Sequence, residues 1–245
     1  MSDRAPSAIM TQRLSPQDAL DLFPTPPWAT RALFEEVLLP RGWVKRIRTA
    51  GGFKSVEGCW DPACGKGHMT LPLREYFYSV FASDVFNWGF GDRRDLDFNF
   101  ATSADAGRSI GWVIMNPPFV IAEAMLMRAL EIATEGVAML LRLAWLEGGE
   151  RYRLVFEGPN RPQLLCPFAD RVPMIADVWD PEASSTTAYA WFVWRKSGPA
   201  LDLSVQHIRP GAPTRYGKLS DLALATPGEA ERRRKAKAAS KAGVS

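Results

Sequence analysis

Three apolar segments of this chain each end at a polar residue that opens a turn, and this pattern constrains the fold more than any other feature. The segments and their end residues are 56–60 with Asp61, 79–84 with Asp84, and 110–115 with Asn116. Apolar strands that alternate with helices predict a parallel sheet covered by helices on both faces. In such sheets ligands bind outside the carboxyl ends of the strands, so we expect the three polar residues at one binding edge.

The rest of the chain extends this alternation. Helices are expected from residue 15 to the prolines at 24–27, from 27 to about 39, over 68–76 and over 120–134. Further strands are expected over 95–98, 137–143, 187–194 and 201–208. The last two can pair as an antiparallel hairpin that closes the sheet. We therefore expect an α/β fold with a doubly wound, mostly parallel, seven-stranded sheet and an antiparallel hairpin at its carboxy-terminal end.

The length of 245 residues suits one domain better than two. We expect a flexible amino-terminal segment over 1–14, a single domain over 15–210 and a flexible basic tail over 211–245. The tail contains the run ERRRKAKAASKAG, which is typical of a disordered segment. Proline and glycine punctuate residues 145–186, an irregular region with room for a substrate-recognition insertion.

Composition excludes several classes of protein. Hydrophobic residues at 47% and charged residues at 23% are ordinary for a globular protein, and a net charge of +3 gives no general attraction to nucleic acid. Three cysteines and two histidines provide neither a disulfide framework nor metal-ligand spacing. No signal peptide or membrane-spanning run is evident, so we expect a cytoplasmic protein without a metal or a membrane partner.

The turn after the first strand has the residues of a nucleoside-binding loop. Gly65 and Gly67 let the backbone approach a ligand closely, but Thr70 stands where a dinucleotide loop has its third glycine. S-adenosylmethionine contains no phosphate and does not need that glycine. Asp84, at the end of the next strand, is where a carboxylate accepts hydrogen bonds from a ribose. A simple tight turn with Asp61 as a helix cap is the alternative.

The turn after the 110–115 strand has the residues needed to activate an amino group. Asn and Pro favour turns, yet two prolines followed by Phe119 make this one unusually stiff. The Asn116 oxygen and the Pro117 carbonyl can accept both N–H bonds of an exocyclic amine, which directs its lone pair at a methyl donor. A base must leave its duplex to reach such a site, and Phe119 could stack on it.

Together these motifs resemble the N6-adenine-specific DNA methyltransferases of the class I, Rossmann-like S-adenosylmethionine family. The resemblance rests on FPTPPW at 23–28, DPACGKG at 61–67, Asp84 and NPPF at 116–119, and it covers about residues 20–145. The motif order is similar to that of the gamma enzymes, and the size to that of small phage and prophage forms. Those relatives serve in restriction–modification systems or in phages. Their long carboxy-terminal recognition domain has no room here, so sequence recognition is expected to be short or lax.

The resemblance implies a role for each matching residue. The Asn-Pro-Pro-Phe turn would be catalytic, through Asn116, Pro117, Pro118 and Phe119. Asp97 would accept from the adenine amino group of the cofactor, with Asp95 as its rival. The residues implied for S-adenosylmethionine binding are Thr25, Pro26, Asp61, Ala63, Gly65, Gly67, Asp84, Val85, Phe86, Asp97 and Phe98.

The acceptor and its binding surface are less constrained than the chemistry. DNA adenine is the expected substrate; RNA adenine, cytosine N4, a protein glutamine amide and a catalytically silent binding module stay open. Glutamine enzymes usually carry Tyr in place of Phe119, and cytosine enzymes Ser or Asp in place of Asn116. The candidate DNA contacts are Arg142, Trp145, Arg151, Tyr152, Arg153, Arg161, Arg171 and the run Arg232-Arg233-Arg234-Lys235, unless these form only a solvated surface.

Overall fold

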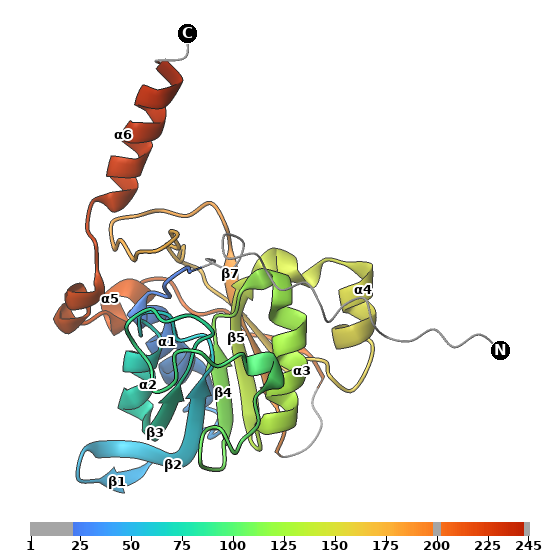
Figure 1. Ribbon diagram of the computed structural model, residues 1–245. Helices are drawn as coiled ribbons and strands as arrows, with labels where there is room; N and C mark the ends of the chain where they lie inside the picture. Colours follow the sequence, from blue (N-terminus) through green and yellow to red (C-terminus); the bar gives the residue numbers. More distant parts are fainter. Residues whose placement is uncertain (1–21, 198–201, 243–245) are drawn as a thin grey trace.

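The computed structural model describes residues 22–197 and 202–242 (Figure 1). The flexible segment expected over 1–14 and the helix expected from residue 15 lie outside the described residues. The described chain forms a mixed sheet with helices on both of its faces. This arrangement confirms the expected α/β class.

Eight strands make up the sheet in the part of the chain that the structure describes, where we expected seven. Four of them are parallel neighbours in the order β3 (Phe77–Ala82), β2 (Gly52–Asp61), β4 (Trp112–Met115) and β5 (Gly136–Arg142). Next to β5 come β7 (Tyr189–Arg195), which is antiparallel to both of its neighbours, then β6 (Leu164–Pro167) and β8 (Ser204–Val205). β1 (Ile47–Thr49) forms a hairpin with the first residues of β2.

The strand order creates a switch point between β2 and β4. From β2 the chain moves outward to β3, and it then returns to the other side of β2 to form β4. The connections that follow β2 and β4 therefore leave in opposite directions. A crevice outside the carboxyl ends of these two strands results, which is the usual ligand position in doubly wound sheets.

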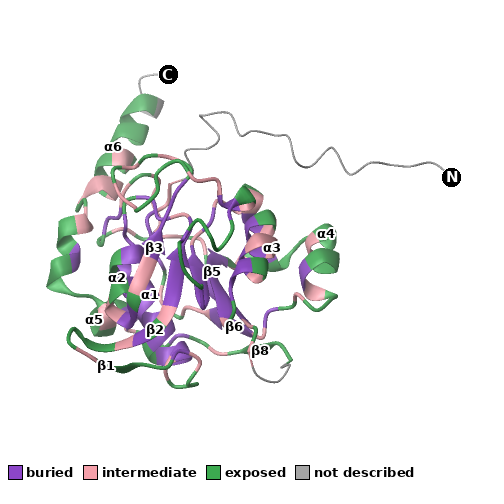
Figure 2. Cartoon of the chain, turned by 60° about the horizontal axis from the view of Figure 1, so that its bottom comes forward, coloured by how far each residue is buried: buried purple, intermediate pink, exposed green. Residues whose placement is uncertain are grey.

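Alternate residues of the central strands pack into two separate cores. Trp112 and Ile114 of β4 pack on the side of α1 (Pro27–Leu33) and α2 (Thr70–Tyr76), in the first core. Val113 and Met115 pack in the second, against α3 (Ala122–Ile132). Successive side chains of a strand point to opposite faces, so a strand covered on both sides is apolar throughout. Figure 2 shows the resulting buried centre.

Local sequence explains where the main helices begin. Pro27 occupies the first turn of α1, where a missing N–H costs nothing. A π-helical turn, η1 (Phe34–Leu38), continues α1, in agreement with the helix expected from 27 to about 39. The buried residues of α3 recur at helical spacing and face the sheet. They are Ala122, Met125, Leu126, Ala129 and Ile132.

Two strand expectations were wrong. No strand forms over 95–98, because the Asp97 side chain accepts a hydrogen bond from Asn99 N and caps a 3₁₀ turn, η2 (Phe98–Phe100). The expected hairpin between 187–194 and 201–208 does not form either. Its first strand, β7, pairs with β5 and with β6, and β6 comes from the region 145–186 that looked irregular. β8 joins the far side of β6 instead.

The tail expected over 211–245 is not structureless. α5 (Ala212–Tyr216) follows a left-handed Gly211, and the 3₁₀ turn η6 (Leu219–Leu224) carries Asp221, whose carboxylate receives two hydrogen bonds from Arg31 of α1. The domain therefore extends beyond the boundary expected at residue 210. The expected disordered run forms α6 (Glu229–Ala242), which projects away from the body (Figure 1).

The remaining described helical elements are short. α4 (Gly149–Arg151) and the π-helical turn η5 (Tyr152–Phe156) follow β5 and the 3₁₀ turn η4 (Leu143–Leu146). A further 3₁₀ turn, η3 (Phe119–Ile121), leads into α3. None of the described helices is long and apolar enough to cross a membrane.

Candidate active site

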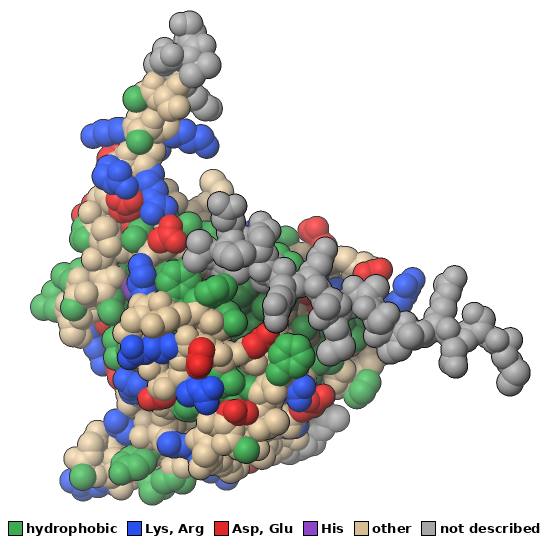
Figure 3. Space-filling view, in the orientation of Figure 1, with side chains coloured by type: hydrophobic (Ala, Val, Ile, Leu, Met, Phe, Trp, Pro, Cys, Tyr) green, Lys and Arg blue, Asp and Glu red, His purple; other side chains and the backbone are tan. Residues whose placement is uncertain are grey.

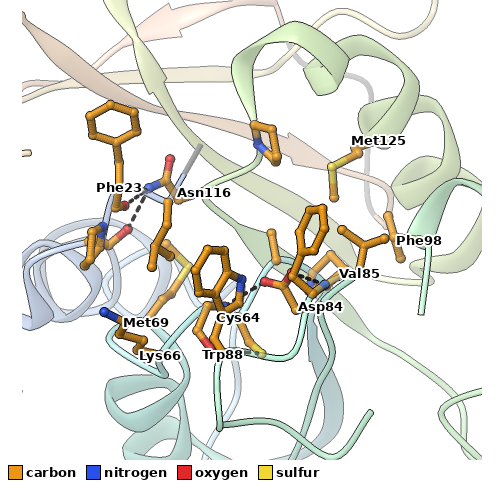
Figure 4. Close-up of a pocket in the computed structure, with 18 of the residues that line it drawn as sticks. Phe23, Cys64, Lys66, Met69, Asp84, Val85, Trp88, Phe98, Asn116 and Met125 are labelled. Carbon is orange, nitrogen blue, oxygen red and sulfur yellow. Dashed lines mark hydrogen bonds between the residues drawn. The ribbon is translucent and has the colours of Figure 1, made fainter. Parts of the chain in front are cut away.

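A pocket lies at the switch point and brings together segments that are far apart in the sequence (Figure 4). It encloses about 750 Å³ of space that protein atoms do not fill, part of it open to solvent. Its walls come from residues 22–25, from the glycine loop, from 84–88 and 96–99, and from the segment after β4. The lining includes ten predicted site residues: Thr25, Ala63, Gly65, Asp84, Val85, Phe86, Asp97, Phe98, Asn116 and Pro118.

Asp84 connects the second strand of the motif to the glycine loop. Its Oδ2 accepts a hydrogen bond from Gly65 N at 2.9 Å, and its Oδ1 accepts one from Phe86 N at 3.0 Å. Burial raises the pKa of Asp84, and these backbone N–H groups oppose that rise by favouring the charged form. Gly65 has a left-handed φ of +50°, and a Cβ there would come within 2.6 Å of Leu22 Cδ1. Glycine is favoured at this point of the loop, because other residues rarely adopt this φ and a Cβ would also displace the Leu22 side chain.

Asp61 lies beneath the loop and does not line the pocket. Its side chain is fully buried, and its Oδ2 accepts a hydrogen bond of 2.6 Å from the Thr70 hydroxyl. Burial raises the pKa of Asp61 to about 7. Asp61 thus joins the end of β2 to the start of α2.

Asn116 is oriented by residues from the amino-terminal segment. Its Nδ2 donates to Phe23 O at 2.8 Å and to Thr25 Oγ1 at 3.1 Å. A backbone carbonyl can only accept, so the amide nitrogen must face Phe23 and the amide oxygen must point the other way. Figure 4 shows this oxygen directed away from the Phe23 carbonyl, so it is not used by that hydrogen bond.

Phe119 lies beside the pocket without lining it. The Arg142 guanidinium sits 4.4 Å from the centre of its ring, and the Tyr189 ring is 6.4 Å away, centre to centre. Phe119 is half-buried, so part of the ring remains available to a flat partner.

Three other predicted residues, Pro26, Pro117 and Gly67, lie outside the lining of the pocket. Pro26 is buried at the start of α1, and Pro117 is buried after β4. Gly67 has a φ of +88°, and a Cβ there would meet the Phe90 ring at 2.6 Å. Of the two rival acids, Asp97 lines the pocket, whereas Asp95 is exposed and pairs with Arg93.

One of three comparisons with known proteins, the one with solved structures, finds matches. No family model and no curated sequence matches the chain. A solved structure described as a candidate RNA methyltransferase from Pyrococcus horikoshii aligns over 76% of this chain and 91% of its own, at 14% identity and a TM-score of 0.51. The chain has the Rossmann-like methyltransferase fold.

Two further solved structures align with this chain at lower TM-scores. A candidate class I S-adenosylmethionine-dependent methyltransferase from Listeria monocytogenes aligns over 78% of this chain and 67% of its own, at 10% identity and a TM-score of 0.47. A chain of a DrdV–DNA complex aligns over 78% of this chain and 28% of its own, at 13% identity and a TM-score of 0.49. At these identities the likeness concerns the fold alone.

Within the methyltransferase fold, the predicted DNA contacts fall into different environments. Arg142 contacts the Asn-Pro-Pro-Phe turn through Phe119. Arg151 pairs with Glu123 and donates to Trp145 O, and Trp145 itself is buried, so this pair holds the fold together. Arg161 pairs with Asp202, and Arg171 donates to Thr186 O. The exposed Tyr152 and Arg153 lie on η5.

One segment of the site was missed by the sequence reasoning. The Met174 sulfur lies 3.8 Å from Asn116 Nδ2. Asp177, which has a φ of +70°, donates from its N–H to Leu22 O, and its own carbonyl accepts from Lys66 Nζ. These contacts join positions over 50 residues apart, which no local pattern reveals. The described residues contain no cluster of three potential metal-ligating His, Cys, Asp or Glu side chains.

Proposed function

We propose that this protein is an S-adenosylmethionine-dependent methyltransferase that methylates the exocyclic N6 amino group of adenine in DNA. The orientation of Asn116 carries the proposal. Two hydrogen bonds on its nitrogen fix the amide, so its oxygen would be able to accept from a substrate in the same pocket as the glycine loop and Asp84. A turn with no catalytic role would not need its asparagine fixed in this way from another segment.

The residues present fit the proposed cofactor. The pocket is lined mainly by apolar side chains, with a few polar groups at its ends, as nucleoside sites usually are. Asp84 lines the pocket at the end of its strand, and its carboxylate is the group that would accept from a ribose. Val85, Phe86 and Phe98 would surround the adenine, with Asp97 near its amino group. Thr25 and the glycine loop would face the methionine end.

S-adenosylmethionine would supply an electrophilic methyl group attached to a sulfonium. The Asn116 oxygen and the Pro117 carbonyl would accept the two N–H bonds of the target amine and aim its lone pair at the methyl carbon. The bound cofactor would give up its methyl group to the amine nitrogen with loss of the C–S bond, and the amine would release one proton to solvent. Correct positioning supplies much of the rate in such a step.

The target base would have to leave the duplex to enter this pocket. Phe119 lies close to Asn116 in the chain and has a half-buried ring on which an extruded base could stack. Stacking of a base on an aromatic ring is worth about 1–3 kcal/mol. Roles in restriction–modification or in a phage follow from the motif resemblance and belong to the same proposal.

The decisive experiment measures tritium transfer from labelled S-adenosylmethionine to unmethylated DNA, with RNA and total protein in parallel reactions. Nucleoside mass spectrometry should find N6-methyladenine in the DNA digest. Asn116→Ala should abolish transfer and leave cofactor affinity nearly intact, as calorimetry would show. Label in RNA alone, N4-methylcytosine, or methylated glutamine would each replace the proposed acceptor. Full activity of Asn116→Ala would refute the mechanism.

A further inference from the structure

Helix α6 concentrates the positive charge of the chain. From Arg232 to Ala242 it contains six basic residues and no acidic one. The whole chain carries a net charge of only +3, so the rest of the protein is net negative. A net negative body repels a polyanion, and α6 would have to overcome that repulsion. Figure 3 shows the basic side chains gathered along this projecting helix.

The helix starts from a fixed point on the body. The Asp180 carboxylate is 1% exposed, and its Oδ2 accepts from Ala230 N at 2.9 Å in the first turn of α6. Just before the helix, Thr226 N donates to Trp179 O at 2.7 Å. The Arg233 guanidinium reaches back to Ala176 O at 3.0 Å. Three anchors over two turns set the direction in which α6 leaves the body.

The anchor segment is also part of the candidate active site. The segment that holds α6, residues 174–180, places Met174 against the Asn116 amide. It is tied to the glycine loop through Lys66 and to the amino-terminal wall through Leu22. The base of α6 is thus connected to the pocket through residues 174–180. In Figure 1 the helix projects on the side of the molecule opposite the β1–β2 hairpin.

The composition of α6 narrows the choice of partner. Its only apolar residues are alanines, so it lacks both the large side chains of a membrane-surface helix and the apolar stripe of a helix that packs on another protein. Its cations Arg232, Arg234, Lys235 and Lys237 are exposed. Three of these four pair only with Glu229 or Glu231 in the first turn. Such surface pairs are weak and can be exchanged for phosphates.

We propose that α6 is a duplex-binding arm that contacts the DNA phosphate backbone beside the site of base extrusion. Its 14 residues span about 21 Å, and a duplex of that length presents roughly a dozen phosphates. The identity of the duplex as substrate rests on the proposed function, but the interaction surface does not require methyl transfer.

The test uses the full-length protein and an unmethylated, fluorescently labelled DNA duplex. One variant replaces the four exposed cations of α6 by glutamine, which keeps the helix propensity: Arg232→Gln, Arg234→Gln, Lys235→Gln and Lys237→Gln. A control variant removes the same four positive charges from the β1–β2 hairpin and the residues just before it, on the side of the molecule opposite α6. Its substitutions are Lys45→Gln, Arg46→Gln, Arg48→Gln and Lys54→Gln. Fluorescence anisotropy over a range of salt concentrations gives affinity and its salt dependence for each protein.

We expect the α6 variant to bind at least about tenfold more weakly than the control variant, because phosphate neutralisation dominates affinity. Its slope of log affinity against log salt should be less steep by about 0.9 for each phosphate that the arm no longer neutralises. S-adenosylmethionine affinity should not change. If both variants bound the DNA duplex equally weakly, the loss of affinity would come from net charge and not from α6, and the proposal would be overturned. The proposal would also be overturned if the α6 substitutions weakened binding to RNA but not to the DNA duplex. If the wild-type protein transferred no methyl group but the α6 variant still bound DNA more weakly than the control variant, the proposed function would be refuted. The proposal that α6 binds the duplex would stand.

Discussion

At the scale of single residues, the site depends on one amide whose orientation is set from another segment. Thr25 Oγ1 accepts from Asn116 Nδ2, so Thr25→Val should remove one of two hydrogen bonds that orient the amide, at nearly constant volume. A hydrogen bond of this kind is worth about 0.5–1.5 kcal/mol, which corresponds to a loss of up to about tenfold in kcat. Thr25 also lines the pocket at the proposed methionine end of the cofactor, so KM for S-adenosylmethionine is measured beside kcat. Thr25→Ser keeps the hydroxyl and should restore the rate. A Thr25→Val enzyme with wild-type kcat would show that Phe23 O alone holds the amide.

Asp61 is a second single residue with a measurable consequence. Burial raises its pKa to about 7 from an unperturbed 3.8, so between these pH values the folded protein holds a proton that the unfolded chain releases. The contribution of Asp61 to stability therefore falls as pH rises from about 4 to about 7, by up to about 1.4 kcal/mol for each pH unit in this window. Asp61→Asn should flatten the pH dependence of unfolding in urea across the same window. An identical pH profile in both proteins would show that Asp61 is ionised in the folded state throughout.

At the scale of elements, a buried charge cluster joins the carboxy-terminal segment to the sheet domain. Arg31 of α1 donates to both oxygens of Asp221 at 2.7 Å and also binds Glu75 of α2. Arg31 and Asp221 are both less than a tenth exposed. These pairs explain why residues 212–226 fold onto the body, although their sequence predicts a tail.

Removing one partner of this cluster should be costly. Asp221→Leu leaves part of the Arg31 charge uncompensated in a buried position and should destabilise the protein by about 3–5 kcal/mol. The double variant Arg31→Met with Asp221→Leu should recover part of that loss, because no buried charge remains from the pair. Urea unfolding gives both values, and proteolysis near residues 212–226 should increase in the single variant. Equal stability of the single and double variants would mean that Glu75 and Tyr216 O satisfy Arg31 alone.

At the scale of the whole molecule, stability rests on two apolar cores and not on covalent links. Cys59, Cys64 and Cys166 are free and buried, and burial raises the pKa of all three thiols. Thiol reagents should therefore react only slowly with the native protein and fast after unfolding in urea. A reducing agent should not shift Tm. Fast titration of one thiol in the native state would indicate that the pocket opens at Cys64.

The local sequence was sufficient to predict the buried central strands of the sheet and the loops that follow them. β4, and β5 up to Arg142, are apolar because helices cover them on both faces, and this pattern predicted them within two residues. The glycine loop, Asp84 and Asn116 were placed at one edge for the same reason, since the carboxyl ends of parallel strands meet there. The alternation of β7 places Trp191 in one core and Trp194 in the other, and both are buried.

Tertiary structure decided what depends on partners distant in the chain. β6 inserts next to β7, and β8 joins β6, because an apolar pattern specifies a strand but not its neighbour. Residues 212–226 fold because Arg31 offers a buried partner for Asp221, and α6 forms on a cap supplied by Asp180. Phe23 and Thr25 fix the Asn116 amide from over 90 residues away. The sequence by itself determined the parallel central strands and the loops that follow them, because a buried strand is apolar on both faces. Only the packing of distant segments determined the order of the antiparallel strands, how the Asn116 amide is held and where the charged helix stands.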